Sequence, residues 1–492
     1  MKTDNTIKIT FWGLICAILC FCSYFIMHNA AWLLGDDCQT LIYTGWDKPI
    51  FGFFVTPTLG RFFPLDYTIY DVLCLFYEGQ IPPSAHYFIH VLCFILYVGV
   101  FIGLALYILK DYKTIWKYSI AFMVALLVIG RTYINFMQCW TGVWTIFTFL
   151  PLFAYGTLKF LDTKKWLYAI LALISINYIL YYYETMFTIP LAIGVCALLF
   201  SYKRLDKEER IYYYFLVASG MLFLLLYAVL VLPKVETFYA HHLNVSPFVN
   251  AAKMFFAQKI MWVVVVFLVV RLVSFFQKKT QFNIYDNMLL ASCAYCCGAA
   301  FLGLNYTLYY TPAVLVAIPA ILYFSKEYLQ DKWVLILFVL LALFYCRKLP
   351  KQIEDTQNGR VSTYQKVHNL IENINDQAVY FYEPENPALE PWELDIRSCR
   401  KFYLEKVTGW YMQDQDFEII RMNKFDNQPG LWQVVEADQC DFTTICPTAK
   451  EIINFNESKI YQVTTSNESI QSPKVWSKCS SQPVNKAHPS TA

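Results

Sequence analysis

Charged residues are scarce in this sequence. Asp, Glu, Lys and Arg make up 15% of its 492 residues, whereas 57% are hydrophobic and 18% are aromatic. Soluble domains carry about a quarter charged residues, so the composition excludes an ordinary soluble globular protein. Several stretches instead hold about 17 to 25 mostly apolar residues, which is enough to cross a bilayer core of roughly 30 Å as a helix. The sequence predicts a polytopic α-helical membrane protein.

An excess of charge of either sign is also missing. The formal net charge is +2, and the basic residues are scattered among short loops, which excludes a nucleic-acid partner and gives no sign of an acidic substrate. A small-residue cleavage site is not evident after the first apolar run, residues 11–32. That run is too long and too uninterrupted for a cleavable signal peptide, so we expect a retained first span.

Eleven segments are predicted to span the membrane. They lie at 11–32, 86–109, 118–135, 141–160, 166–183, 186–202, 211–232, 254–276, 287–304, 308–325 and 333–347. With the amino terminus in the cytoplasm, every inner loop carries Lys or Arg, as the positive-inside rule requires. These loops begin "KDYKTIWK" at 110, "DTKKW" at 162, "YKRLDKEER" at 202, "QKKT" at 277 and "SKEYLQDKW" at 325. The expected location is a cell membrane crossed many times.

The same parity places the carboxy-terminal part outside the cytoplasm. We expect an all-α membrane domain over 1–347, with a first outer loop at 35–85, and a small α/β or mostly β extracytoplasmic domain over 348–492. Its four cysteines would suit one or two disulfides in an oxidising compartment, with free buried thiols as the alternative. The N-x-S/T triplets also fall on the predicted outer side. These residues are Cys399, Cys440, Cys446, Cys479, Asn244, Asn305, Asn456 and Asn467.

The first outer loop carries the sharpest local patterns. It opens with adjacent carboxylates in "WLLGDDCQT", at Asp36 and Asp37, directly after the first span. A "GRFFPL" turn follows at 60–65, and apolar residues at helical spacing from about 65 to 77 predict an amphipathic helix along the membrane interface. The loop is therefore expected to be folded.

This arrangement resembles the GT-C superfamily of integral-membrane glycosyltransferases, which use polyprenyl-phosphate sugars. Members have many spans, acidic residues soon after the first span, interfacial helices in the same loop and often a carboxy-terminal domain on that side. The "GRFFPL" turn is similar to a Gly-Arg-aromatic-x-Pro stretch of some bacterial members. The resemblance implies a bilayer-bound lipid-phosphate sugar donor and a glycan, lipid or protein acceptor.

The expected chemistry explains the carboxylates. A lipid-phosphate-linked sugar already has a good leaving group, so the enzyme must orient and deprotonate the acceptor hydroxyl and stabilise the developing phosphate charge. We expect Asp36 or Asp37 to be the base and the anomeric centre to be inverted. The neighbouring carboxylate could raise the first one's pKa or help to bind a divalent metal. The alternative is a polar helix exit, where both residues merely solvate the end of the span.

Arg61 is the first candidate for the donor phosphate. A guanidinium binds two phosphate oxygens at once, and the preceding glycine allows a close backbone approach. Lys48 and Arg131 lie on the same predicted side and are further phosphate-binding candidates. The alternative for Arg61 is a surface ion pair or a contact with lipid headgroups.

Other outer-side residues are candidates for the reaction cavity: Glu184 in "YYYET", Lys234, His241 and His242. An interfacial aromatic belt accounts equally well for the tyrosines beside Glu184. The two adjacent histidines have no further ligand at metal-binding spacing, so we predict no metal residues. Arg271 is expected to extend its side chain to the inner membrane face.

Three other functions compete with the transferase. A secondary transporter usually shows related halves and broken spans with charges near the midplane, whereas these halves look unrelated. A lipid-linked polysaccharide polymerase or ligase tends to carry its large loop late in the chain. A receptor or assembly module needs far fewer spans than eleven.

Overall fold

A computed structural model describes the backbone of much of the chain. Its described residues are 2–30, 55–56, 60–65, 68–77, 82–138, 143–235, 249, 253, 256–257, 259–301, 307–374, 379–382, 419–422, 432–436, 449–455 and 458–463. Contacts divide the chain into two compact units. The first comprises Met1–His28, Pro49–Val72 and Ala85–Asp355, and the second comprises Asn29–Lys48, Leu73–Ser84 and Thr356–Ala492. The predicted domain boundary at 347/348 stays a prediction.

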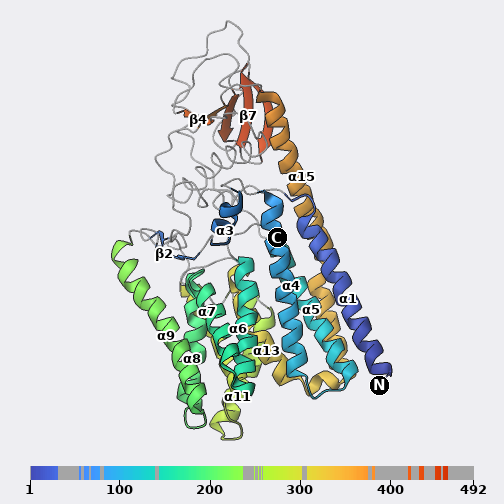
Figure 1. Ribbon diagram of the computed structural model, residues 1–492, viewed down its shortest axis with the longest axis vertical. Helices are drawn as coiled ribbons and strands as arrows, with labels where there is room; N and C mark the ends of the chain where they lie inside the picture. The colour runs from blue at the N-terminus through green and yellow to red at the C-terminus, as the bar shows by residue number, and fades with distance from the viewer. Residues whose placement is uncertain are drawn as a thin grey trace. The chain divides into compact units, whose positions relative to one another are not determined.

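Long helices build the first unit (Figure 1). They are α1 (Lys2–Met27), α4 (Pro83–Ile108), α5 (Thr114–Met137), α6 (Val143–Thr163), α7 (Trp166–Leu180), α8 (Thr188–Ser201), α9 (Lys207–Leu230), α11 (Lys259–Phe276), α12 (Ile284–Phe301), α13 (Thr311–Ser325) and α14 (Lys332–Cys346). Each predicted span coincides with one of them. Helices dominate because their backbone groups are paired internally, which a hydrocarbon environment requires.

Membrane crossing is supported for part of this set. Seven helices in the described part of the chain are long and apolar enough to span a bilayer, and shorter apolar helices lie at Trp166–Leu180, Ile260–Phe276 and Thr311–Ser325. A polytopic architecture is therefore confirmed, whereas the count of eleven spans is not.

Successive helices run in opposite directions, so the bundle has two distinct ends. We call one the charged end, where the connections at 109–113, 164–165, 202–206, 277–283 and 326–331 lie. The opposite end, here the loop end, carries the turn 60–65, the break between α7 and α8, and the short helices η3 (Leu232–Lys234) and η4 (Thr307–Tyr310). The predicted inner loops thus gather at one end, as the positive-inside analysis requires.

Small residues set the closest helix contacts. A methyl group added at Gly156 of α6 would lie 2.9 Å from the Tyr168 carbonyl oxygen of α7. One added at Gly194 of α8 would lie 2.7 Å from Val217 Cγ2 of α9. Without a side chain, these backbones approach closely enough for extensive van der Waals contact, which replaces hydrophobic driving force between helices in lipid.

The second unit contains a mixed β-sheet. Its strands are β3 (Val379–Tyr382), β4 (Ile419–Met422), β5 (Trp432–Glu436), β6 (Ala449–Phe455) and β7 (Ser458–Val463), in the order β4-β3-β5-β7-β6. β3 is parallel to β4 and β5, while β7 is antiparallel to β5 and β6. Helix α15 (Leu349–Ile374) precedes the sheet in sequence. The class of this domain, α/β or mostly β, stays a prediction.

Candidate functional site at the loop end

Seven residues, 181–187, connect α7 to α8 at the loop end, and the first five of them are Tyr181 to Thr185. We call this segment the 181–185 junction. It includes the start of the short helix η2 (Glu184–Phe187), and Tyr183 before it has an extended backbone with φ −153° and ψ 121°. The chain therefore leaves the α-helix for a few residues, which frees backbone groups to bond with other segments.

Tyrosines of the junction contact two neighbouring segments, the turn 60–65 and η4. The carbonyl oxygen of Tyr181 accepts a hydrogen bond from the Leu65 N–H at 3.0 Å. Tyr182 is buried, with 1% exposure. The Tyr183 ring stacks on that of Tyr309 in η4, with centroids 5.9 Å apart. These contacts show that the three tyrosines pack against neighbouring segments at the loop end. An interfacial aromatic belt alone would not account for them.

Glu184 and Thr185 complete the junction. Glu184 is buried, with 7% exposure, and its Oε1 accepts a hydrogen bond from the Phe62 N–H at 3.0 Å. The Thr185 hydroxyl donates to the Tyr295 hydroxyl of α12 at 3.0 Å, and Tyr295 in turn donates to the Tyr309 carbonyl oxygen at 2.9 Å. One short segment thus ties α12, η4 and the turn 60–65 together.

The turn 60–65 packs against the end of α9. Gly60 has a φ of 70°, a conformation that favours glycine, and its carbonyl oxygen accepts from the Tyr227 hydroxyl at 2.8 Å. The Phe62 ring lies 5.5 Å from that of Phe223, centroid to centroid, and is 3% exposed. β2 (Arg61–Phe62) pairs with β1 (Val55–Thr56) in an antiparallel ladder. The turn is therefore fixed at several points along its length.

The predicted amphipathic helix after this turn is present as α3 (Thr68–Tyr77). The Thr68 hydroxyl and N–H both donate to the Leu65 carbonyl oxygen, at 2.5 and 3.2 Å. These two bonds start the helix directly after the turn, where the sequence placed it.

The structure locates some of the predicted site residues. Glu184 lies in the junction, Lys234 ends η3 with an exposed side chain, and Arg61 begins β2 with only its backbone described. Asp36, Asp37, Lys48, His241 and His242 lie outside the described residues, as do the four tail cysteines and the four N-x-S/T asparagines. Their proposed roles stay predictions.

Arg131 sits within α5, six residues before its end. Its guanidinium carbon lies 6.0 Å from the centroid of the Tyr345 ring on α14, a cation–π geometry at the edge of the effective range. Next to it, Gly130 brings α5 against α14, since an added methyl would lie 3.0 Å from the Cys346 backbone nitrogen. Arg131 is thus a half-buried cation at a close helix contact.

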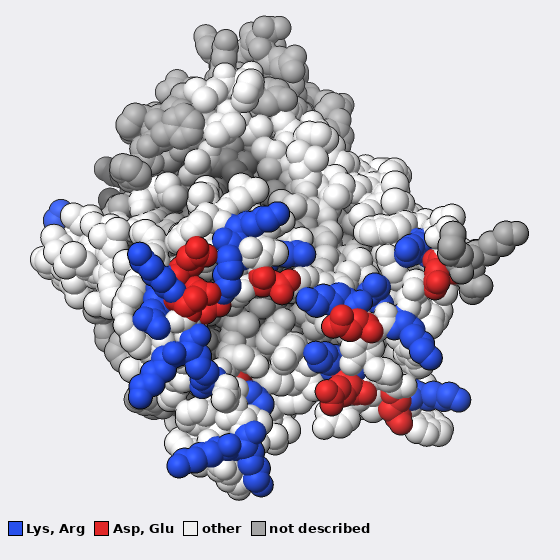
Figure 2. Space-filling model, turned by 60° about the horizontal axis from the view of Figure 1, so that its bottom comes forward, with Lys and Arg blue, Asp and Glu red and all other residues white. Residues whose placement is uncertain are grey.

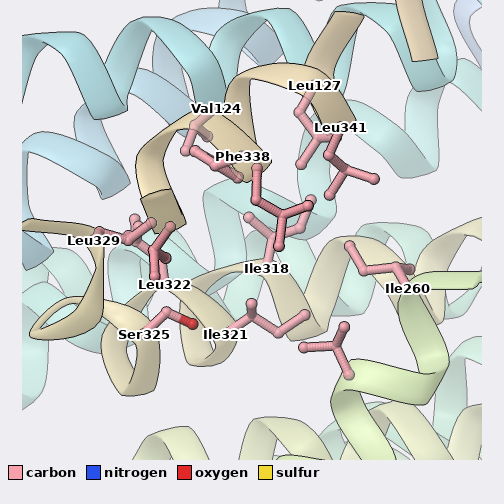
Figure 3. A pocket seen from close by; sticks show the side chains of 13 residues that line it. Val124, Leu127, Ile260, Ile318, Ile321, Leu322, Ser325, Leu329, Phe338 and Leu341 are labelled. Carbon is pink, nitrogen blue, oxygen red and sulfur yellow. The ribbon is translucent and has the colours of Figure 1, made fainter. Parts of the chain in front are cut away.

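An apolar groove of about 210 Å³ opens between α5, α11, α13 and α14 (Figure 3). Its walls include Leu127, Val263, Ile318, Ile321 and Leu337, and the serine hydroxyl of Ser325 is the one polar side-chain group among its lining residues. Leu337 is 67% exposed and Val263 39% exposed, so the groove reaches the apolar outer surface of the bundle. Such a surface suits a hydrocarbon chain and no charged or strongly polar ligand.

Comparisons with known proteins give two similarities. No protein-family model matches the chain. Over 109 residues, 21% of this chain, it is 30% identical to a DNA ligase of Clostridium tetani (strain Massachusetts / E88), and this segment spans only 15% of that protein's length. That share of either chain is too small to define a family.

The second similarity is structural. The chain aligns with the crystal structure of ArnT from Cupriavidus metallidurans bound to undecaprenyl phosphate. The alignment covers 94% of this chain and 99% of that one, with a TM-score of 0.46 and 11% sequence identity. An alignment at this level defines neither a site nor an activity for this chain.

Metal-binding geometry is not found in the described part of the chain. Among those residues no group of three or more His, Cys, Asp and Glu side chains is arranged to hold an ion. Asp36 and Asp37 lie outside the described residues, so a divalent metal bound by them stays a prediction.

The structure contains a buried histidine pair that is not among the predicted site residues. His86 and His90, both with 0% exposure, lie one turn apart on α4, and their ring centroids are 4.2 Å apart. His90 Nδ1 lies 2.9 Å from the Phe136 carbonyl oxygen of α5, and its ring packs on Trp144 of α6 at 4.3 Å. The spacing "HYFIH" in an otherwise apolar helix is the signal that would have found this pair.

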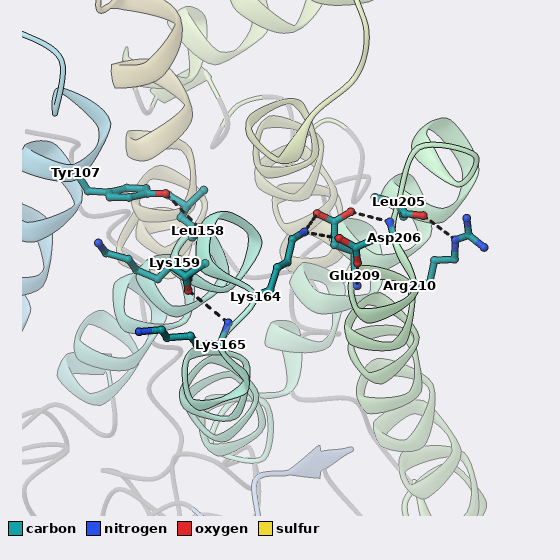
Figure 4. Close-up of polar contacts among 10 residues, drawn as sticks. Tyr107, Leu158, Lys159, Lys164, Lys165, Leu205, Asp206, Glu209 and Arg210 are labelled. Carbon is teal, nitrogen blue, oxygen red and sulfur yellow. Dashed lines mark hydrogen bonds and ion pairs between the residues drawn. The ribbon is translucent and has the colours of Figure 1, made fainter.

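The charged end has a different character (Figure 2). Lys and Arg outnumber Asp and Glu in its loops, and both signs are interspersed across this face. Lys164 lies in the α6–α7 connection and bonds both Asp206, at 2.7 Å, and Glu209 (Figure 4). Asp206 and Glu209 also form a capping box that begins α9.

Arg271 forms a bidentate ion pair at this end. Its Nε donates to Asp286 Oδ1 at 2.7 Å and its Nη2 donates to Asp286 Oδ2 at 2.8 Å. Asp286 is fully buried and also accepts from the Asn283 N–H at 2.8 Å. The same Nη2 donates to the Gln281 carbonyl oxygen in the 277–283 connection at 2.8 Å, so the side chain extends to the charged end and there forms a bidentate pair with a buried carboxylate. Its extension to the inner membrane face stays a prediction.

Proposed function

We propose that this protein is a membrane glycosyltransferase of the GT-C type. It would transfer a sugar from a polyprenyl-phosphate donor to a glycan, lipid or protein acceptor at the extracytoplasmic membrane face, with inversion at the anomeric carbon. The observation that carries the proposal is the turn 60–65, which carries Arg61 and is anchored at the bundle end opposite the charged loops. The same first loop begins with Asp36 and Asp37.

The polarity of the bundle supports the proposed orientation. Lys and Arg are concentrated in the loops of the charged end, and such loops remain in the cytoplasm in most membrane proteins. The loop end would then face the extracytoplasmic side. A polyprenyl-phosphate sugar presents its headgroup at that surface while its tail remains in the bilayer.

The apolar groove supports a lipid-linked donor. It lies within the helical bundle, it is lined by aliphatic side chains, and it reaches the surface that would contact lipid. Each buried CH₂ group of a prenyl or acyl chain contributes about 0.8 kcal/mol, so even a few isoprene units would bind with useful affinity. A carrier for a small polar solute would instead need polar groups along its path.

In the proposed reaction, Asp36 or Asp37 accepts the proton of the acceptor hydroxyl. The acceptor oxygen attacks the anomeric carbon as the bond from that carbon to the phosphate oxygen breaks. The bonding electrons leave with the lipid phosphate, whose negative charge the Arg61 guanidinium would balance, with Lys48 and Arg131 as further candidates. Stabilisation of the departing phosphate is the main electrostatic requirement, because the leaving group needs no proton.

Reconstitution tests the activity directly. Purified protein in liposomes would be supplied with a panel of undecaprenyl-phosphate-linked hexoses and pentoses, and the release of undecaprenyl phosphate would be followed by mass spectrometry. The proposal expects release with at least one donor, stimulated by an extract that contains acceptors. Uptake of a free solute without any release would favour the transporter instead.

A further inference from the structure

Glu184 was a candidate for the reaction cavity, yet its described contact is with backbone. Its Oε1 accepts the hydrogen bond of the Phe62 N–H across 122 positions of sequence, and the carboxyl is 7% exposed. Phe62 directly follows Arg61, the residue proposed to bind the donor phosphate. Glu184 therefore contacts the chain one residue away from the functional arginine.

Two more contacts hold the same turn on either side. Tyr227 donates to the Gly60 carbonyl oxygen at 2.8 Å, and the Leu65 N–H donates to the Tyr181 carbonyl oxygen at 3.0 Å. Arg61 is thus bracketed by Gly60 and Phe62, each bonded to a different helix end. Of the three anchors, only Glu184 approaches through a carboxyl group, and only Glu184 and Tyr227 use side chains that mutation can remove.

We propose that Glu184 is a positioning residue, which fixes the turn 60–65 so that Arg61 can bind the phosphate of the lipid donor. This inference rests on the proposed function. A buried amide without an acceptor is costly, so the turn would leave its place if the Glu184 oxygen were removed. Arg61 would then be displaced, because a short segment cannot move one residue without its neighbour.

The rival role for Glu184 is proton transfer in the reaction. The two roles make opposite demands on Glu184→Gln. An amide oxygen still accepts from the Phe62 N–H, so a positioning residue tolerates the change, whereas a proton acceptor does not. Glu184→Met keeps a side chain of similar size but has no oxygen to accept the hydrogen bond or a proton, so it should lose function whichever role Glu184 has.

The test uses the full-length protein in detergent micelles with undecaprenyl phosphate as the probe. Binding is measured from the shift in thermal midpoint across a lipid titration, and the position of the turn is measured by hydrogen exchange of the peptide that contains Phe62. For Glu184→Met we expect binding weakened by about tenfold or more and faster exchange of that peptide. Glu184→Gln should stay within about threefold of wild type in both measurements.

A double-mutant cycle separates positioning from an independent contribution. If Glu184 acts through Arg61, then Arg61→Ala with Glu184→Met should bind the lipid no more weakly than Arg61→Ala alone. Tyr227→Phe removes a second anchor more mildly and should weaken binding in the same direction, which keeps the test available if Glu184→Met folds poorly. Thr157→Val is the control, since it removes a buried hydroxyl pair with Tyr212 elsewhere in the bundle.

Several outcomes would overturn the inference. One is normal binding by Glu184→Met together with faster exchange at Phe62, because the turn would then be free to move without consequence. Another is additive loss in the double mutant, and a third is loss of binding in Glu184→Gln. Absence of binding by the wild-type protein would instead overturn the lipid-donor proposal itself, while the exchange result would still report whether Glu184 holds the turn.

Discussion

The two ends of the helical bundle are held in different ways. At the charged end, ion pairs such as Lys164 with Asp206 lie at the surface, with side-chain exposures of 34% and 47%. At the loop end, the turn 60–65 is fixed by single hydrogen bonds from buried or half-buried groups, and Phe62 is 3% exposed. Solvated pairs contribute little and tolerate change, whereas buried bonds to backbone specify one arrangement. The contrast therefore separates the exposed Lys164 pairs from the buried contacts of the turn 60–65, and the buried Asp286 shows that the charged end also holds one contact of the second kind.

The largest expected effect concerns the two carboxylates proposed as the base, whose replacement should lower activity without loss of stability. Asp36→Asn and Asp37→Asn should both fold, and at least one should lower the rate of sugar transfer by about 100-fold or more, because an amide cannot accept the acceptor's proton. Donor release in liposomes measures the rate, and thermal midpoints check the fold. Full activity in both variants would remove the proposed base.

A second change tests whether the charged end is tolerant throughout. Arg271→Met leaves the fully buried Asp286 without its bidentate partner, and removal of one member of a buried pair costs about 3–5 kcal/mol. A large fall in the thermal midpoint is expected. Arg204→Met is the matched control, since Arg204 is exposed and also bonds the 277–283 connection, through Gln281 at 2.7 Å. Equal falls in the thermal midpoints of both variants would contradict the distinction between buried and exposed contacts.

Gly60→Ala probes the backbone of the turn. Gly60 has a φ of 70°, and a Cβ in the left-handed region costs about 1–2 kcal/mol. Weaker undecaprenyl phosphate binding is expected, with little change in overall stability, because the strain falls on a peripheral segment. Gly99→Ala, on the open face of α4 with nothing within 4 Å of the added methyl, should leave binding unchanged. Unchanged binding in Gly60→Ala would show that the turn accommodates the strain without moving.

The smallest effects belong to the exposed pair at the charged end. Asp206→Ala removes the side-chain cap of α9, which is typically worth about 1 kcal/mol. Partial burial opposes ionisation of this carboxyl, but the Lys164 ammonium and the Glu209 N–H hold the pKa of Asp206 below its ordinary value. Its contribution to stability is therefore present above the unfolded pKa of about 3.9 and is lost as the pH falls through the lower folded pKa.

The pKa of Lys164 shifts in the opposite direction to that of Asp206. Burial alone would lower its pKa, but hydrogen bonds to Asp206 and Glu209 raise the pKa of Lys164 above its ordinary value. Its contribution is present below the unfolded pKa of about 10.4 and is lost as the pH rises through the folded pKa. Thermal scans of Lys164→Ala from mildly acidic to alkaline pH, at low and high salt, should show a small deficit that high salt removes. If the lower thermal midpoint of Lys164→Ala persisted at high salt, the pair would behave as a buried ion pair and the prediction would be wrong.

Part of the loop end was predictable from residue order. "GRFFPL" marked a turn and the apolar periodicity after it marked a helix, and both are present as the turn 60–65 and α3. "YYYET" stands out in the sequence, but nothing in the residue order indicates its partners. Glu184 bonds Phe62 and Thr185 bonds Tyr295, pairs separated by 122 and 110 positions. Pairings at such separations depend on how helices pack, which local patterns do not encode.

The sequence by itself determined that this is a helical membrane protein with its basic loops at one end, because hydrocarbon allows only internally paired backbone and because apolar length and loop charge are local properties. Tertiary structure alone decided that Glu184 bonds the turn beside Arg61 and that Asp286 forms an ion pair with Arg271. A buried polar group takes whichever partner the packing brings within about 3 Å, and that partner can come from any part of the chain.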